Sequence, residues 1–132
     1  MLTRPEHGWS EVCIGEHRLR VSYLEPVPHM LLTVFIRAMS TGGTADVTFD
    51  AEGWTWRLQS DRVTRLTIMA DATETHIVPV TVRELAQEAL ADFQRDLDVW
   101  SSGWSSRNRP EQAENERTEI IRLCRQLEKL LS

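Results

Sequence analysis

Histidine, cysteine and carboxylate side chains could do chemistry in this chain, but they are not spaced to share a metal ion. The histidines and cysteines are His7, His17, His29, His76, Cys13 and Cys124. No histidine lies four residues from another or beside a cysteine pair, so the spacings by which adjacent turns converge on zinc are absent. Cys13 and His17 flank a predicted turn and could in principle point at one ion, but surface or core positions without a ligand role are the stronger interpretation. We therefore expect no metal and no cofactor.

Signatures of covalent catalysis and of nucleotide binding are also absent. The chain has no nucleophile elbow, no glycine-rich phosphate loop before a helix and no dinucleotide fingerprint. Gly42 and Gly43 stand at a predicted helix end, where glycine is favoured for backbone reasons. Asp46, Asp50 and Glu52 surround a predicted strand and turn, where carboxylates keep an edge soluble, although a glycosidase-type pair stays open. We expect a protein that is not an enzyme.

Tryptophans and arginines are better candidates, because both are favoured at interface hot spots. Trp54 and Trp56 lie two residues apart on a predicted strand and are expected in the core. Trp104 lies in a predicted loop near Arg107 and Arg109, and together with a second exposed tryptophan it would form an aromatic and arginine patch. The candidate interaction surface comprises Asp46, Asp50, Glu52, Arg57, Arg65, Trp104, Arg107 and Arg109.

The composition is that of one ordinary globular domain of 132 residues, 41% apolar and 27% charged. Fifteen basic against 20 acidic residues give a net charge of −5. The arginines are scattered among carboxylates, which argues against nucleic acid as the main partner. Two cysteines, no apolar signal-peptide core and no apolar run of ~20 residues predict a cytoplasmic protein without a membrane span. Arginine supplies nearly all the basic residues, which suggests a GC-rich bacterial coding sequence.

The side chains of residues 46–80 alternate between apolar and polar over most of the stretch, which predicts an antiparallel meander with one buried face. The expected core residues are Phe49, Trp54, Trp56, Leu58, Leu66 and Ile68, and the expected open-face residues are Thr55, Arg57, Thr64, Arg65 and Thr67. Pro79 lacks a ladder donor, so the last strand is expected to be an edge or to end there.

Helices and a hairpin are expected around this meander. Residues 1–8 form a loose N-terminus, and residues 9–24 form a hairpin. The apolar segment from Pro28 to Ser40 is expected to be a helix, with a central strand as the alternative. Thr81 and Glu84 have the spacing of a capping box, so a helix should run from there to about Trp100. Residues 101–109 form a loop, and an amphipathic helix over residues 110–132 packs on the domain or serves in dimerisation.

The predicted fold is α+β, with a single domain over residues 9–100. An antiparallel sheet of about five to six strands carries two to three helices mainly on one face, in the order β-β-α-β-β-β-β-α-α. The hairpin, the proline-flanked apolar segment, the strand Phe49-Asp-Ala-Glu-Gly-Trp-Thr-Trp-Arg-Leu58 and the segment Thr81-Val-Arg-Glu-Leu-Ala-Gln together resemble small bacterial α+β proteins of the immunity type. Such proteins neutralise secreted toxins by occlusion. The resemblance covers about residues 9–100 and carries no defined site.

These observations favour a non-enzymatic protein-interaction module, with a basic toxin as one partner that would suit the acidic chain. The alternative is a small-ligand binding module or cryptic enzyme, with an apolar pocket between Trp54, Trp56, Phe93 and the first helix. A homodimer through residues 110–132 is the third possibility.

Overall fold

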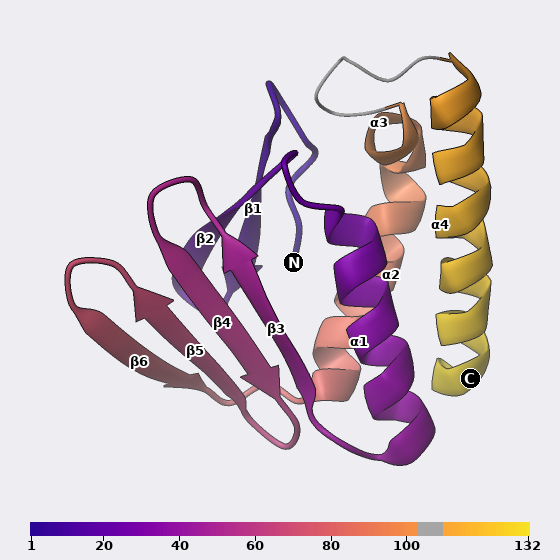
Figure 1. The fold of residues 1–132 in the computed structure, drawn as a ribbon. Helices are drawn as coiled ribbons and strands as arrows, with labels where there is room; N and C mark the ends of the chain where they lie inside the picture. Colours follow the sequence, from indigo (N-terminus) through magenta and orange to yellow (C-terminus); the bar gives the residue numbers. More distant parts are fainter. Residues whose placement is uncertain (103–109) are drawn as a thin grey trace.

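The computed structural model describes residues 1–102 and 110–132 and confirms the α+β class, with the predicted order of elements and one additional short helix near the C-terminus (Figure 1). Its elements are β1 (Trp9–Ile14), β2 (His17–Ser22), α1 (Val27–Thr41), β3 (Ala45–Asp50), β4 (Thr55–Ser60), β5 (Thr64–Met69), β6 (Thr73–Val78), α2 (Val82–Arg95), α3 (Leu97–Ser101) and α4 (Pro110–Leu131). In place of the one sheet of about five to six strands that was predicted, the strands divide between two antiparallel sheets, a β1-β2 hairpin and a β3-β4-β5-β6 meander.

The meander buries one face, as the alternating pattern predicts. Phe49, Trp56, Leu58 and Leu66 are fully buried, whereas Trp54 and Ile68 are partly buried and pack against the core. The prediction that Thr64 lines the open face is wrong. Thr64 lies two residues before Leu66 and therefore shares its buried face. Its hydroxyl lies 2.8 Å from the Ser60 hydroxyl and donates to the Val80 carbonyl at 2.9 Å, so burial leaves no unpaired polar group.

The β1-β2 hairpin packs across the buried face of the meander. The indole Nε1 of Trp56 on β4 donates to the Arg20 carbonyl of β2 at 2.8 Å. Three residues earlier on β2, the His17 ring lies 4.4 Å from the His76 ring of β6. Three residues of strand span about 10 Å, which equals two strand spacings, so β2 crosses the meander strands steeply. Figure 1 shows the hairpin behind the four-stranded sheet.

The helices lie beside the β3 edge of the meander and the hairpin lies behind it, so the face of the meander toward the viewer is uncovered (Figure 1). Val27–Thr41 is a helix, so the alternative of a central strand is wrong. It begins with proline in its first turn and ends at Gly42, whose φ of 69° is the left-handed conformation that glycine tolerates. α1 lies against β3, and α4 packs on α1, α2 and α3. The buried residues of α4 are Ile120, Leu123, Cys124 and Leu127.

The helix predicted from Thr81 to Trp100 is divided at Asp96 into α2 and α3. Its start is as predicted, because the Thr81 hydroxyl accepts a hydrogen bond from the Glu84 amide at 3.1 Å. Asp96 leaves helical geometry at φ −107° and ψ 29°. Its carboxylate is buried against Arg95 at 2.8 Å and Arg4 at 3.3 Å. Arg4 is distant in sequence, so the helical pattern could not reveal this break.

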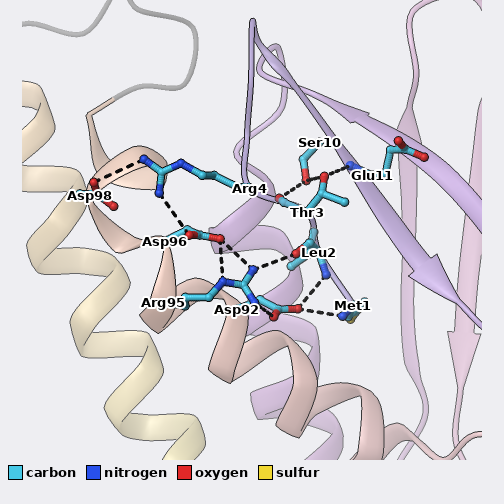
Figure 2. A network of polar contacts seen from close by, with 10 residues as sticks. All are labelled: Met1, Leu2, Thr3, Arg4, Ser10, Glu11, Asp92, Arg95, Asp96 and Asp98. Carbon is cyan, nitrogen blue, oxygen red and sulfur yellow. Dashed lines mark hydrogen bonds and ion pairs between the residues drawn. The ribbon is translucent and has the colours of Figure 1, made fainter.

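Residues 1–4, where a loose terminus was expected, are attached to α2 (Figure 2). The Met1 ammonium lies 2.9 Å from Asp92 Oδ2, and the Leu2 amide donates to the same oxygen at 2.7 Å. Leu2 is buried and forms an isolated bridge with Val12. The guanidinium of Arg95 closes this network by donating to the Leu2 carbonyl at 3.3 Å. The N-terminal segment thereby lies beside β1 as a short strand-like extension of the hairpin sheet.

Candidate functional site

The uncovered face of the meander, which we call the open face, presents three cross-strand rows of side chains. The rows are Asp46, Gln59, Arg65 and Ile77; Thr48, Arg57, Thr67 and Thr75; and Asp50, Thr55, Met69 and Thr73. Every one of these side chains is exposed or half-buried. The open face therefore brings together four of the predicted surface residues, Asp46, Asp50, Arg57 and Arg65.

Asp46 and Arg57 neutralise each other on this face. The Nε and Nη2 atoms of Arg57 donate to the two carboxylate oxygens of Asp46 at 2.8 and 2.6 Å. Hydrogen bonding to Arg57 lowers the pKa of Asp46, and the same contact raises the pKa of Arg57. The charge of Asp46 is thus already matched within the protein, and Asp46 is a poor candidate to attract a partner's cation.

Three other carboxylates gather where β3 ends, and we call Glu25, Asp50 and Glu52 the acidic corner. The Asp50 amide donates to Glu25 Oε1 at 2.5 Å, and the Glu52 amide donates to Asp50 Oδ1 at 2.9 Å. The Ser22 hydroxyl donates to Glu52 Oε2 at 2.7 Å. These partners are neutral, and none of the ion pairs found in the described ranges involves the acidic corner. Its negative charge is therefore uncompensated.

The backbone of the acidic corner is held in an uncommon conformation. Glu52 has a φ of 58°, a left-handed value that is rare for a residue other than glycine, asparagine or aspartate. The next residue, Gly53, also has a positive φ, and the Ala51 amide donates to the Trp54 carbonyl at 2.8 Å to close the turn. Leu24, beside Glu25 in sequence, is 62% exposed. The corner thus displays carboxylates next to an uncovered apolar side chain.

Apolar side chains gather at another part of the open face, which we call the apolar corner: Val63, Ile77 and Pro79. Val63 is 45% exposed and Ile77 is 54% exposed. Ile77 pairs with Arg65, so Val63, two residues before Arg65, is its diagonal neighbour. Arg65 is exposed and lies between these apolar groups on β5. A partner that covers this corner removes apolar surface from water.

The two corners lie at diagonally opposite ends of the open face. Asp50 ends β3 in one outer row, whereas Ile77 lies on β6 in the other outer row. Three strand spacings and four residues of strand separate them, which corresponds to about 20 Å. Five of the twelve open-face residues are threonines, so side-chain hydroxyl groups are frequent between the two corners. The open face therefore places the acidic corner and the apolar corner at opposite ends of a largely polar surface.

The tryptophan patch expected from the sequence is not assembled in the described residues. Trp100 is buried and contacts Phe93 edge to face at a centroid distance of 5.2 Å. Trp9 is half-buried, with the Arg20 guanidinium 5.5 Å from its ring centroid. Trp104, Arg107 and Arg109 fall in residues 103–109, outside the described ranges.

Metal-ligating clusters, surface depressions and buried carboxylates are the features of the described residues that bear on catalysis or on small-ligand binding. Within residues 1–102 and 110–132, no group of three or more histidine, cysteine or carboxylate side chains could hold a metal ion. Trp56 and Phe93 are fully buried, and neither lines any of four depressions of about 330–600 Å³ on the described surface. Asp92 and Asp96 are buried, but both are bound by Arg95 and fix the N-terminal segment (Figure 2). Their pairing indicates a structural role.

Sequence reasoning missed Leu24, Glu25, Val63 and Ile77. The alternation of Thr73, Thr75 and Ile77 along one strand face carried a usable signal for Ile77. Glu25 had no such signal, since its contact with Asp50 depends on the tertiary placement of the segment before α1.

Comparison of this chain with protein-family models, with curated proteins and with solved structures finds no match. None of the helices in the described ranges is both long enough and apolar enough for a bilayer crossing.

Proposed function

We propose that this protein is a non-enzymatic interaction module that docks a protein partner on the open face of its meander. The observation that carries the proposal is the uncovered sheet face that joins an uncompensated acidic corner to an apolar corner. Cores of interfaces need apolar area, and charged groups near the rim supply specificity and speed of association. The open face offers both within one rigid sheet.

The proposed partner carries basic side chains opposite Glu25, Asp50 and Glu52, and an apolar group opposite Val63 and Ile77. Six residues of strand and four strands give a face of about 20 by 14 Å. Such a face covers about 280 Å², roughly a third of the 800 Å² per partner of a standard interface, so the loops at both corners must supply much of the contact. Its diagonal layout also fixes how the partner is oriented, because turning the partner would set its basic groups against Arg65.

A toxin-neutralising role of the immunity type is the specific form of this proposal. An acidic protein is a favourable binding partner for a basic toxin, because complementary charge raises the association rate above that of partners without charge complementarity. A reducing, cytoplasmic setting is part of the proposal, because Cys13 and Cys124 are both free thiols. A second copy of this chain, bound through α4, is a separate partner that we propose on separate grounds below.

Affinity capture from the source organism tests the docking face. We would compare wild type with Thr67→Arg, which places a bulky charge at the centre of the open face, and with the double variant Asp50→Lys/Glu52→Lys. Gln87→Arg on the exposed side of α2 is the control matched in charge to Thr67→Arg. The proposal expects one stoichiometric protein, retained by the control and lost from both open-face variants. Retention by Thr67→Arg, or a co-purifying small molecule in place of a protein, would overturn it.

A further inference from the structure

The outermost stripe of α4 carries acidic residues in its first half and basic residues in its second half, whereas the exposed flank residues Arg117 and Glu128 do not follow this division. We call the set Glu111, Glu114, Asn115, Thr118, Arg122, Arg125, Gln126 and Lys129 the outer stripe, and all eight side chains are exposed. At 3.6 residues per turn these positions lie opposite the buried residues Ile120, Leu123 and Leu127. α4 is the outermost helix and lies on the far side of the molecule from the meander (Figure 1). The outer stripe is thus available without disturbing the open face.

We propose that a second copy of this chain packs along the outer stripe, with the two α4 helices antiparallel. The first half of the stripe is acidic, with Glu111 and Glu114, and the second half is basic, with Arg122, Arg125 and Lys129. Parallel helices would set like charges together. Antiparallel helices set the acidic half of each copy against the basic half of the other, so only this arrangement is self-complementary.

The stripe also defines the register of the two helices. Glu111 and Lys129, Glu114 and Arg125, and Asn115 and Gln126 are each placed symmetrically, to within one residue, about position 120. A twofold axis near that position brings each residue opposite the other member of its pair in the second copy. Glu114 and Arg125 lie on one flank of the stripe, and the two amides lie on the other flank. A twofold axis perpendicular to the helix pair keeps each flank on its own side, so all three pairings form together.

The surface between these pairs suits close approach. A shallow depression of about 600 Å³ is lined by Thr118, Ile121, Arg122, Arg125, Gln126 and Lys129. The small Thr118 side chain lies near the proposed axis, and the stems of the basic side chains provide apolar walls. The acidic half of the second copy would lie over this basic depression.

A charge gradient along a helix has a simpler origin as well. Acidic residues near the first turn and basic residues near the last turn complement the helix dipole. Arg122 also pairs with Glu119 of its own helix at 3.0 Å. The helix dipole does not explain why the charged residues lie on the outermost stripe. It also does not explain why Asn115 and Gln126 are symmetric about the same position as the charge pairs. Those two features support the second copy as the occupant.

The dimer is expected to be weak, because one helix pair buries less than the ~1,200 Å² of small specific interfaces. Sedimentation equilibrium up to about 1 mM protein would measure it, with NaCl raised from about 50 to about 500 mM to screen the charge pairs. We expect at least a tenfold loss of dimer affinity at high salt. Wild-type protein that stays monomeric at low salt would overturn the proposal.

A charge swap tests the register. Glu111→Lys and Lys129→Glu should each weaken the dimer about tenfold or more by creating two like-charge contacts, and Glu111→Lys/Lys129→Glu should restore wild-type affinity to within about threefold. Both changes oppose the helix dipole, so an effect through helix stability would add up in the double variant. Asp71→Lys and Arg62→Glu, on meander turns, change the net charge equally and should leave dimerisation unchanged. A double variant as weak as the singles would contradict the antiparallel register. Capture of a partner on the open face is measured separately, so either proposal can fail alone.

Discussion

Asp46 on β3 and Arg57 on β4 are joined by two hydrogen bonds of 2.8 and 2.6 Å, although they are diagonal rather than directly opposite neighbours. At one end of β3, Asp46 is neutralised by Arg57. At the other end, the acidic corner has no such partner among the described residues. A surface that looks uniformly acidic in the sequence therefore has one end that is electrostatically satisfied and one that is not.

The lowered pKa of Asp46 should depend on the guanidinium of Arg57. Hydrogen bonding to Arg57 holds that pKa below its ordinary value of 3.8, so Arg57→Gln should raise it. A carboxyl carbon NMR titration of Asp46 measures the change. Arg65→Gln, on the same face and one strand further from Asp46, is the control and should leave the Asp46 titration in place. An unchanged Asp46 titration in Arg57→Gln would mean that the pair does not form in solution.

The acidic corner offers a test that separates stability from binding. Glu52→Ala and Glu52→Gly both remove the carboxylate that accepts from Ser22. Only glycine also relieves the left-handed backbone at φ 58°, so Glu52→Gly should be more stable than Glu52→Ala by about 1 kcal/mol. Urea unfolding measures the difference. Both variants should lower the affinity for the captured partner equally, because both lose the same charge. Unequal affinities would show that the conformation of the turn matters instead.

Asp96 should stabilise the fold in a pH-dependent manner. Hydrogen bonds from Arg95, and in smaller part from Arg4, lower its pKa below the ordinary 3.8. A lowered folded-state pKa means that the stabilisation is present above the unfolded value and is lost as the pH falls through the folded value. Asp96→Asn should lower the free energy of unfolding by about 1–3 kcal/mol near neutral pH.

Chemical unfolding near pH 7 and near pH 3 tests this dependence. The gap between wild type and Asp96→Asn should narrow at the lower pH. Asp98→Asn is the comparison, since Asp98 is 70% exposed and only approaches Arg4 at 3.8 Å. A gap that stays constant between the two pH values would argue that Asp96 is not held as a carboxylate.

The two cysteines should differ in reactivity. Burial raises the pKa of Cys124 to about 11, so on the order of one thousandth of it is thiolate near pH 8. Cys13 is only half-buried. Alkylation of the native protein followed by peptide mass spectrometry should find Cys13 labelled first and Cys124 labelled at a comparable rate only after unfolding. Fast native labelling of Cys124 would contradict the packing of α4 on α1 and α2.

Local rules account for most of the fold. Alternation predicted the meander and its buried Phe49 and Trp56, Pro79 marked the end of β6, and Thr81 with Glu84 marked the start of α2. The break at Asp96 and the attachment of Met1 escaped prediction for one reason. Both depend on charges some ninety residues apart in sequence, which no local pattern encodes.

The candidate site could be predicted from the sequence to about the same extent as the fold. Strand phase placed Arg57 and Arg65 on one face, because side chains two residues apart in a strand share a side. Asp46 and Asp50 were expected only around a strand and turn, and the strand register places them on that same face. Strand phase could not show that Arg57 neutralises Asp46 while Glu25 joins Asp50, since both contacts depend on tertiary neighbours. The division of the six strands into two sheets likewise follows from the hairpin crossing over Trp56, a packing choice rather than a sequence period.

Threonine methyl NMR tests the docking face most directly. Thr48, Thr55, Thr67, Thr73 and Thr75 lie on the open face, whereas Thr64 is buried in the same sheet and Thr118 lies on α4. On addition of the captured partner, the open-face methyl signals should shift or broaden while those of Thr64 and Thr118 stay in place. Perturbation confined to Thr118, or to threonines away from the meander, would contradict the proposal that the open face binds the partner.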